Sequence, residues 1–211
     1  MTQTLTQLIA SVQAQLLDDG TRFSTATVTA AVRAALKDFN LSAPINAADV
    51  YDVIAAQKVY EISDSSAISI YDVLEQDADG DDDVSLNFTD YSEDERLYFR
   101  LDDALDSGSL LARYTLPYTV SGLDSATEST LPALYDQVLV DGACYYACTF
   151  RSAGLIETIN LNQGVPASLE KAAASFKTSF VIGLAQAAKK RPAVGEPDAR
   201  AWDDAWHGMD R

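Results

Sequence analysis

The sequence predicts an α+β fold that is mainly α: a helical bundle core, an inserted acidic antiparallel β region, and an extended C-terminal tail. Three observations lead to this prediction. Apolar residues recur at helical spacing near both ends of the chain, they alternate at a period of about two between residues 59 and 120, and acidic residues fill the turns of that middle segment. We expect a single domain over residues 1–190, with a helical core (1–57 and 125–190) and a β insertion (58–124), followed by an extension (191–211).

Two amphipathic helices are predicted at the N-terminus. The first spans residues 4–17, where one helical stripe carries Leu5, Leu8, Ile9, Val12 and Leu16. The second begins after Ser24, a favoured N-cap residue, with Phe23 and Val28 in the positions of a hydrophobic staple. It should end before Pro44, because a residue that precedes proline disfavours the α conformation.

The middle of the chain is predicted to form a small antiparallel sheet built from hairpins. Its strands are short runs rich in β-branched and aromatic residues, "VYEI", "AISIY", "VSLNF", "RLYFRL" and "LLARYTLPYTV". The turns between them are acidic, "QDADGDDD", "TDYSEDE" and "DDALDSGS". We expect these turns to project from one end or edge of the sheet.

Two longer helices are predicted after residue 130. The first is apolar nearly all the way round, with Pro132 in its first turn and Gly154 at its exit, which is typical of a central, buried helix. Small residues on it should let another helix approach closely: Gly142, Ala143, Ala147 and Ala153. The partner is predicted over residues 166–190, with an apolar face of Leu169, Ala173, Phe176, Phe180, Gly183, Leu184 and Ala187.

The net charge of −17 is concentrated in the predicted β insertion. A field of this sign repels phosphate, so we expect no tight or sequence-specific binding of nucleic acid. The negative charge is compatible with a surface past which DNA slides without being bound. The acidic residues that we single out for such a channel or rim are Asp77, Asp79, Asp81, Asp82, Asp83, Glu93, Asp94 and Glu95.

The stretch "QDADGDDDVSL" invites comparison with an EF-hand calcium loop, but the register fails. Counting from Asp77 places Asp82 where the loop needs glycine and Phe88 where it needs glutamate. Counting from Glu75 aligns Gly80 but puts Leu86 at the position of the bidentate glutamate. We therefore interpret the stretch as a hairpin tip, since Asp-Gly is a favoured hairpin dipeptide, and keep an acidic calcium-binding module as the alternative from a different class.

No pattern in the chain predicts catalysis. The one histidine, His207, lies in the predicted tail, and the sequence contains no phosphate-binding loop, dinucleotide fingerprint, nucleophile elbow or Cys/His metal spacing. Paired carboxylates are abundant, but they fall in turns where solvated charge is the ordinary explanation. We expect a protein that is not an enzyme and that has no cofactor and no resident metal.

The N-terminus predicts a soluble protein that is not exported, and the cysteines are predicted to be reduced. The first residues lack the basic and apolar regions of a signal peptide, and no apolar run is long enough to span a bilayer. Cys144 and Cys148 share a helical face at a spacing too wide for a relaxed disulfide. We expect them to be reduced thiols in the core, and we expect no membrane partner.

The C-terminal extension is the predicted site of partner binding. It opens with Arg191 and Pro192, and it holds Trp202 and Trp206 four residues apart. These two tryptophans share a face only if the end is helical, and a helix of this length is marginal when isolated. They either fold back onto their own subunit or anchor the tail on a partner.

The order of these parts resembles the head-tail connector (adaptor) proteins of tailed bacteriophages. The resemblance rests on "RYTLPYTVSGL" and "LVDGACYYAC", followed by a long helix and an extension, and it covers about residues 5 to 190. The β insertion, beginning "VYEISDSSAISIYDVLE", is larger and more acidic than a minimal helical adaptor requires.

The resemblance implies a structural role in the neck of a virion that is assembled in the cytoplasm of a bacterial host. The family forms a ring, usually dodecameric, that docks under the portal protein and continues the channel for double-stranded DNA toward the tail. A tail-completion or stopper protein of the same neck is the alternative within this class. The acidic loops then line the channel or its rim, face solvent, or meet a basic patch on a neighbouring tail component.

Overall fold

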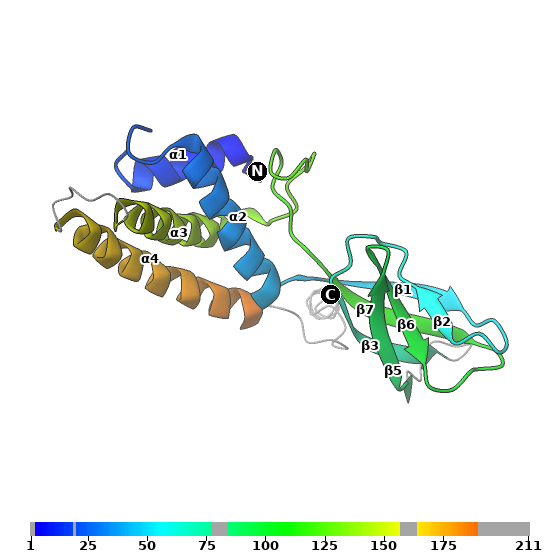
Figure 1. Cartoon of the computed structure of the whole chain (residues 1–211). Helices are drawn as coiled ribbons and strands as arrows, with labels where there is room; N and C mark the ends of the chain where they lie inside the picture. The colour runs from blue at the N-terminus through cyan, green and yellow to red at the C-terminus, as the bar shows by residue number, and fades with distance from the viewer. Residues whose placement is uncertain (1–2, 19, 77–83, 157–163, 190–211) are drawn as a thin grey trace, which may run out of the picture. The chain divides into compact units, whose positions relative to one another are not determined.

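The structure is a computed structural model that describes residues 3–18, 20–76, 84–156 and 164–189 (Figure 1). It confirms the predicted α+β class, with 45% helix against 24% strand, so that helix predominates. The chain forms two compact units: a helical unit of Met1–Ala43 and Leu131–Arg211, and a β unit of Pro44–Thr130. The single domain predicted over residues 1–190 stays a prediction, and we describe each unit by itself.

The helical unit contains four α-helices and one short 3₁₀ helix among the described residues. These are α1 (Leu5–Gln15), α2 (Thr25–Ser42), η1 (Ala133–Tyr135), α3 (Asp136–Ile156) and α4 (Gly164–Lys189). Helix α3 packs against α1, α2 and α4, which confirms the prediction of a central helix. None of the described helices is both long and apolar enough to cross a membrane.

Local sequence signals set the starts of the first two helices, and the Ser24 cap of the second was predicted; α1 is two residues shorter at its end than the predicted span of 4–17. The Thr4 hydroxyl accepts a hydrogen bond from the backbone N–H of Gln7, and the Gln7 side chain accepts one from the Thr4 backbone N–H, closing a capping box at α1. The Ser24 hydroxyl accepts the backbone N–H of Thr27 at the start of α2. Phe23 and Val28, the two predicted staple residues, are both buried.

Two glycines allow α3 and α4 to approach closely. A Cβ at Gly142 would lie 2.7 Å from the ring of Phe180 and 2.9 Å from the Cβ of Ala35. A Cβ at Gly183 would lie 2.7 Å from Val138. The predicted role of Gly142 is thus confirmed, whereas Ala153 is exposed, so its predicted part in the contact is wrong.

The predicted exit of α3 at Gly154 is also wrong, because the helix continues to Ile156. Gly154 adopts no positive φ, and a Cβ at this position would meet nothing within 4 Å, so the residue neither caps the helix nor serves a close contact. A glycine near the end of a helical pattern signals a C-cap only when the backbone turns left-handed there.

The β unit contains two antiparallel sheets instead of the single sheet expected. One has the order β1-β7-β3-β4 and the other β2-β6-β5. The strands are β1 (Ile45–Asp52), β2 (Val59–Glu61), β3 (Ser69–Gln76), β4 (Val84–Ser85), β5 (Phe88–Glu93), β6 (Arg96–Leu101) and β7 (Ser109–Leu116). Strand β1 lies before residue 58, where the sequence placed the start of the insertion, and most of β5 falls in a stretch that was expected to be a turn.

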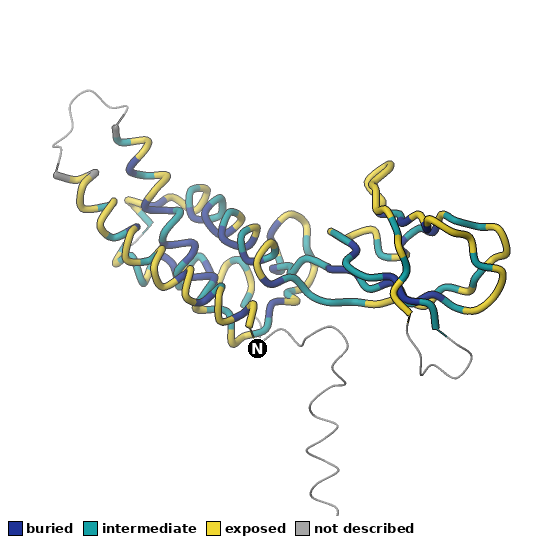
Figure 2. The backbone as a smooth tube through the Cα atoms, turned by 90° about the horizontal axis from the view of Figure 1, so that it is seen from below, coloured by how far each residue is buried: buried dark blue, intermediate teal, exposed yellow. Residues whose placement is uncertain are grey.

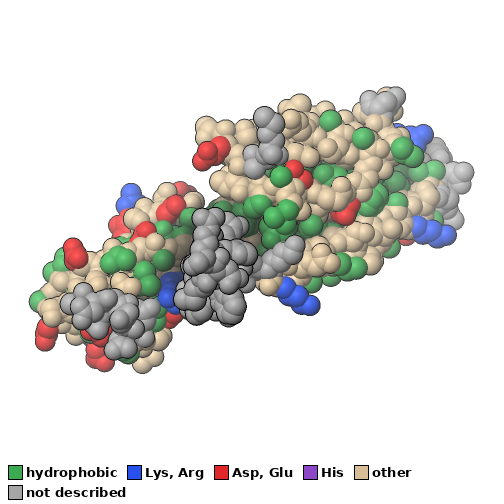
Figure 3. All heavy atoms as spheres, turned by 180° about the vertical axis from the view of Figure 1, so that it is seen from behind, with side chains coloured by type: hydrophobic (Ala, Val, Ile, Leu, Met, Phe, Trp, Pro, Cys, Tyr) green, Lys and Arg blue, Asp and Glu red, His purple; other side chains and the backbone are tan. Residues whose placement is uncertain are grey.

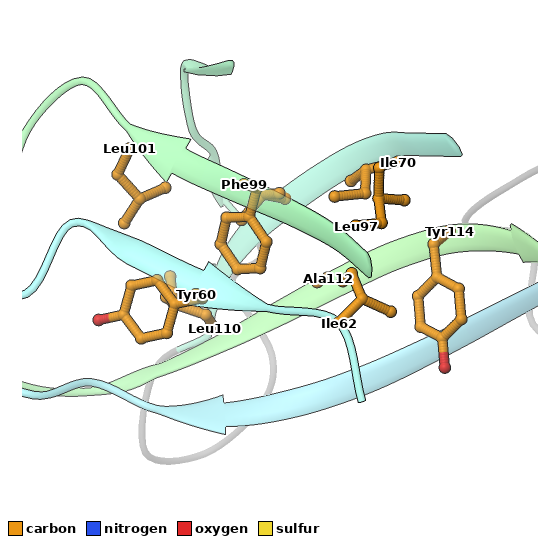
Figure 4. Close-up of a cluster of buried hydrophobic side chains, with 10 residues drawn as sticks. Tyr60, Ile62, Ile70, Leu97, Phe99, Leu101, Leu110, Ala112 and Tyr114 are labelled. Atoms are coloured by element: carbon orange, nitrogen blue, oxygen red, sulfur yellow. The ribbon is translucent and has the colours of Figure 1, made fainter. Parts of the chain in front are cut away.

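The inner faces of the two sheets share one hydrophobic core (Figure 4). Its side chains come from β3, β6, β7 and the segment of β2 with the residue that follows it. They alternate along β6 and β7, as a period of two requires, whereas a register shift on β3 separates Ile70 from Val73 by three positions. Phe99 on β6 lies at its centre, stacked on Tyr60 with 5.3 Å between ring centroids. The cluster comprises Tyr60, Ile62, Ile70, Val73, Leu97, Phe99, Leu101, Leu110, Ala112 and Tyr114.

Cys144 and Cys148 are free and buried in α3, which confirms the prediction of reduced core thiols. Burial raises the pKa of the Cys144 thiol to about 12 and that of Cys148 to about 11. Because the thiolate is the reactive form, both side chains are protonated and inert near neutral pH. They act as small apolar groups in the helix packing.

Candidate functional site: the acidic surface of the β unit

Nearly all of the net charge of the protein belongs to the β unit. Residues 44–130 carry 20 Asp and Glu against 4 Lys and Arg, a net charge of −16 out of −17 for the chain. The rest of the chain has 12 acidic and 11 basic residues and is therefore close to neutral. Figure 3 shows acidic side chains spread over the visible face of the β unit. The two units are thus chemically distinct surfaces.

The β5–β6 hairpin presents the most exposed part of this acidic surface. Glu93 and Arg96 pair at the end of the ladder, so Asp94 and Glu95 form a two-residue turn. Both have positive φ, 50° for Asp94 and 63° for Glu95. Residues 89–96 are exposed throughout (Figure 2). The structure therefore places Glu93, Asp94 and Glu95, three of the predicted rim residues, together at one tip.

The second position of this turn holds Glu95, where the backbone favours glycine; Asp94 at the first position is a residue that such turns accept. A two-residue hairpin turn with positive φ at both positions prefers Asn-Gly, because a side chain in the left-handed region costs roughly 1–2 kcal/mol. Backbone strain of this kind is found preferentially at functional sites. The retained charge of Asp94 and Glu95 is consistent with a role for the acidic tip itself.

We expect Asp94→Asn with Glu95→Gly to stabilise the β unit by about 1 kcal/mol, because it relieves the left-handed strain and removes two like charges. The urea midpoint of the β unit measures the effect. The matched control, Asp94→Asn with Glu95→Gln, removes the same charge but keeps the strain. Its smaller gain should vanish in high salt, where repulsion between exposed carboxylates is screened. Equal gains in both variants would show that strain contributes nothing.

Further acidic residues, which the sequence placed in a turn but did not assign to the rim, extend this surface. Asp102, Asp103 and Asp106 are exposed in the β6–β7 connection, and Asp90 is exposed on β5. Strand β5 lacks the apolar–polar alternation that would have predicted a strand around Asp90. Only a count of acidic residues along residues 88–106 could have assigned these residues to the acidic surface.

The remaining predicted residues lie outside the described part of the chain. Asp77, Asp79, Asp81, Asp82 and Asp83 fall between β3 and β4, which pair antiparallel through Leu74↔Ser85 and Glu75↔Val84. The flanking strands thus pair as a hairpin requires, and the predicted tip itself lies outside the described residues. The predicted partner-binding residues Arg191, Pro192, Trp202 and Trp206 also lie outside the described residues. Within the described residues, no three His, Cys, Asp or Glu side chains are grouped so that they could hold a metal ion.

Three other carboxylates of the β unit have structural partners. Asp49 on β1 accepts hydrogen bonds from the hydroxyls of Tyr114 (3.0 Å), Tyr51 (3.4 Å) and Ser63. Burial and this acceptor raise the pKa of Tyr114 to about 12, so its phenol stays a donor. Among the described residues, Glu61 pairs with Arg96 and Asp72 with Arg113. These groups join neighbouring strands.

A shallow hollow of about 560 Å³ lies on the outer face of the second sheet. Its lining offers one guanidinium and one carboxylate but neither histidine nor cysteine, so the nucleophile–base pair of covalent catalysis is missing from it. The residues are Val59, Thr89, Tyr91, Arg100, Leu101 and Asp102.

No family model matches the chain, and no curated protein matches it. Among the solved structures, similar chains occur in assemblies of which we give three. They are the "Neck of empty GTA particle computed with C6 symmetry" (13% identity, 78% of this chain and 87% of that chain, TM-score 0.31), the "Virion of native gene transfer agent (GTA) particle" (13%, 81% and 88%, TM-score 0.33) and the "Neck of native GTA particle computed with C12 symmetry" (16%, 82% and 92%, TM-score 0.28). These neighbours are structural components of a particle, two of them of its neck. TM-scores of this size do not establish a shared fold, so the function has to be argued from the residues of this chain.

Proposed function

We propose that this protein is a head-tail connector (adaptor) of the kind found in tailed bacteriophages, a non-enzymatic virion protein of the neck that is assembled in the bacterial cytoplasm. It forms a ring under the portal protein and continues the DNA channel toward a tail or neck component. The single observation that carries the proposal is the segregation of charge: a net −16 on an inserted β unit and a nearly neutral helical unit.

Each unit suits one task of a connector. An acidic surface repels the phosphates of DNA, so packaged DNA passes without being held and without sequence-specific contact. A neutral helical unit can pack against copies of itself without that repulsion. The acidic hairpin tip at Glu93, Asp94 and Glu95, with Asp77, Asp79, Asp81, Asp82 and Asp83 on the neighbouring hairpin, lines the channel or its rim.

The two segments that carry the family resemblance occupy positions that the fold depends on. Residues 113–123 form the end of β7 and the start of the return to the helical unit, where Val120 and Leu123 are buried. Residues 139–148 form the middle of α3, including Gly142 at the contact with Phe180.

The mass of the assembled species with and without purified portal protein tests the proposal. We expect a complex in which a ring of this chain is bound to the portal. Trp202→Ala with Trp206→Ala should remove this binding and leave the thermal midpoint of the free chain unchanged, because large aromatic residues dominate interfaces. Trp202→Phe with Trp206→Phe is the matched control and should retain binding. A double alanine variant that loses thermal stability as a monomer would place the tail in the core.

A second arm tests the acidic rim. Glu93→Gln, Asp94→Asn and Glu95→Gln together should leave the portal-bound mass unchanged but increase retention of duplex DNA by the complex at low salt. Unchanged retention would assign these residues to solvent or to a tail component. If neither the wild-type chain nor any variant binds the portal, a stopper or tail-completion protein of the same neck is the function to test next.

A further inference from the structure

Helix α4 has a second apolar face that no other described element of its own subunit covers. Its inner face, with Ala173, Phe180 and Gly183, is buried against α3. On the opposite side, exposed residues recur every three or four positions along the helix (Figure 2). Val181 and Ile182 at its centre are 51% and 53% exposed. We call Ala174, Thr178, Val181, Ile182 and Ala185 the α4 face.

The α4 face has the composition of a buried surface. From Thr178 to Ala188 the helix contains no charged residue. An apolar stripe along a helix is ordinarily covered by protein. The exposed side of α2 shows the contrast, because it carries Arg33 and Lys37 and is suited to solvent.

Helix α1 presents a second uncharged face. It has no charged residue, and its exposed side lies opposite the buried Leu8 and Val12. Leu17, which follows the helix, is 90% exposed and has a φ of 51°. Glycine is the favoured residue at such a left-handed helix end. Leucine at this position costs free energy because its backbone is strained and because its apolar side chain is exposed to solvent. We call Thr6, Ala10, Ala14 and Leu17 the α1 face.

The two faces point away from each other. Both α1 and α4 pack on the α2–α3 pair, and Figure 1 places them on opposite sides of it. Two different patches on opposite sides of a subunit can join copies only head to tail, which closes into a ring or continues as a filament. An α4–α4 contact would instead stop at a dimer.

When two copies of this chain meet, the distribution of charge favours contact between their helical units over contact between their β units. Contact between β units would bring two surfaces of −16 together, and repulsion opposes it. Contact between helical units meets no such penalty. We propose that the α4 face of one copy packs on the α1 face of the next, with Leu17 inserted beside Val181 and Ile182. This inference rests on the proposed ring and adds which surfaces form it.

The substitution Leu17→Gly distinguishes an effect on self-association from an effect on the stability of the monomer. Glycine relieves the left-handed strain, so the thermal midpoint of the monomer should rise, yet self-association should weaken roughly tenfold or more because a leucine no longer becomes buried. Val181→Ser with Ile182→Ser should weaken association similarly with little change in midpoint. Leu41→Ser is the matched control: Leu41 is 69% exposed at the end of α2, outside both faces, and its loss should leave assembly unchanged. Native mass spectrometry of the full chain, alone and with portal protein, measures each.

Mixing the variants tests the head-to-tail pairing. The Leu17→Gly chain keeps an intact α4 face, and the Val181→Ser, Ile182→Ser chain keeps an intact α1 face. An equimolar mixture should therefore form one-to-one pairs and nothing larger. Rings that survive both sets of substitutions, or that Leu41→Ser disrupts equally, would overturn this inference and leave the proposed function standing. A wild-type chain that stays monomeric both alone and with portal protein would overturn both.

Discussion

Replacing Gly142 with alanine is expected to destabilise the helical unit by roughly 1–3 kcal/mol, although alanine is the better helix former. The new Cβ would lie 2.7 Å from the Phe180 ring and 2.9 Å from the Cβ of Ala35. Phe180 is buried and Ala35 has no side-chain torsion with which to yield. The helices must therefore separate, and the lost contacts outweigh a propensity gain of about 1 kcal/mol.

The same helix supplies the control. Gly154 also lies within α3, but a Cβ there meets nothing within 4 Å. Gly154→Ala should stabilise the helical unit by about 0.5–1 kcal/mol, because only the helix propensity changes. Urea midpoints of the two variants should move in opposite directions. A shift in the same direction would mean that α3 and α4 are not in contact at Gly142.

Phe99→Ala is expected to cost the β unit about 3–5 kcal/mol. Phe99 is fully buried between the two sheets, where it stacks on Tyr60 and meets the edge of Tyr51 at 5.9 Å between ring centroids. Its removal opens a cavity that the surrounding strands cannot fill. Because the core around Phe99 contains only β-unit residues, amide hydrogen exchange should lose protection in β2, β6 and β7 and keep it in α3 and α4.

This measurement also tests the predicted domain organisation. Equal loss of protection in both units would support the single cooperative domain predicted over residues 1–190. Tyr91→Ala is the control, since Tyr91 lies on the exposed strand β5 and its ring stacks only on Tyr98 among the described aromatic residues. It should cost no more than about 1 kcal/mol.

The acidic character of the candidate site could be predicted from the sequence, whereas the conformation of its residues could be predicted only in part. Charge runs in the sequence identified Glu93, Asp94 and Glu95 as acidic turn residues, and they form one exposed hairpin tip. The left-handed backbone at this turn was not predicted, because Glu95 stands where glycine would have signalled it. The exposed faces of α1 and α4 were not predicted either, since an apolar stripe indicates burial without showing which of two stripes has a partner.

The features that the sequence determined by itself are local. Ser24 caps α2, Pro44 ends it, and the alternating residues at 96–101 and 109–116 form strands. Caps, proline geometry and the side-chain period all act within a few residues, which is why the sequence alone predicts them. The tertiary structure decided what depends on distant partners. Residues 45–52 lack a strong alternation and become a strand by pairing with β7, where Ile45 meets Leu116 and Asp49 accepts the Tyr114 hydroxyl. Residues 88–93 become a strand through β6 alone. A hydrophobic period of two predicts that a segment is a strand, but long-range packing decides which sheet that strand joins. For this reason the single predicted sheet is two sheets in the structure.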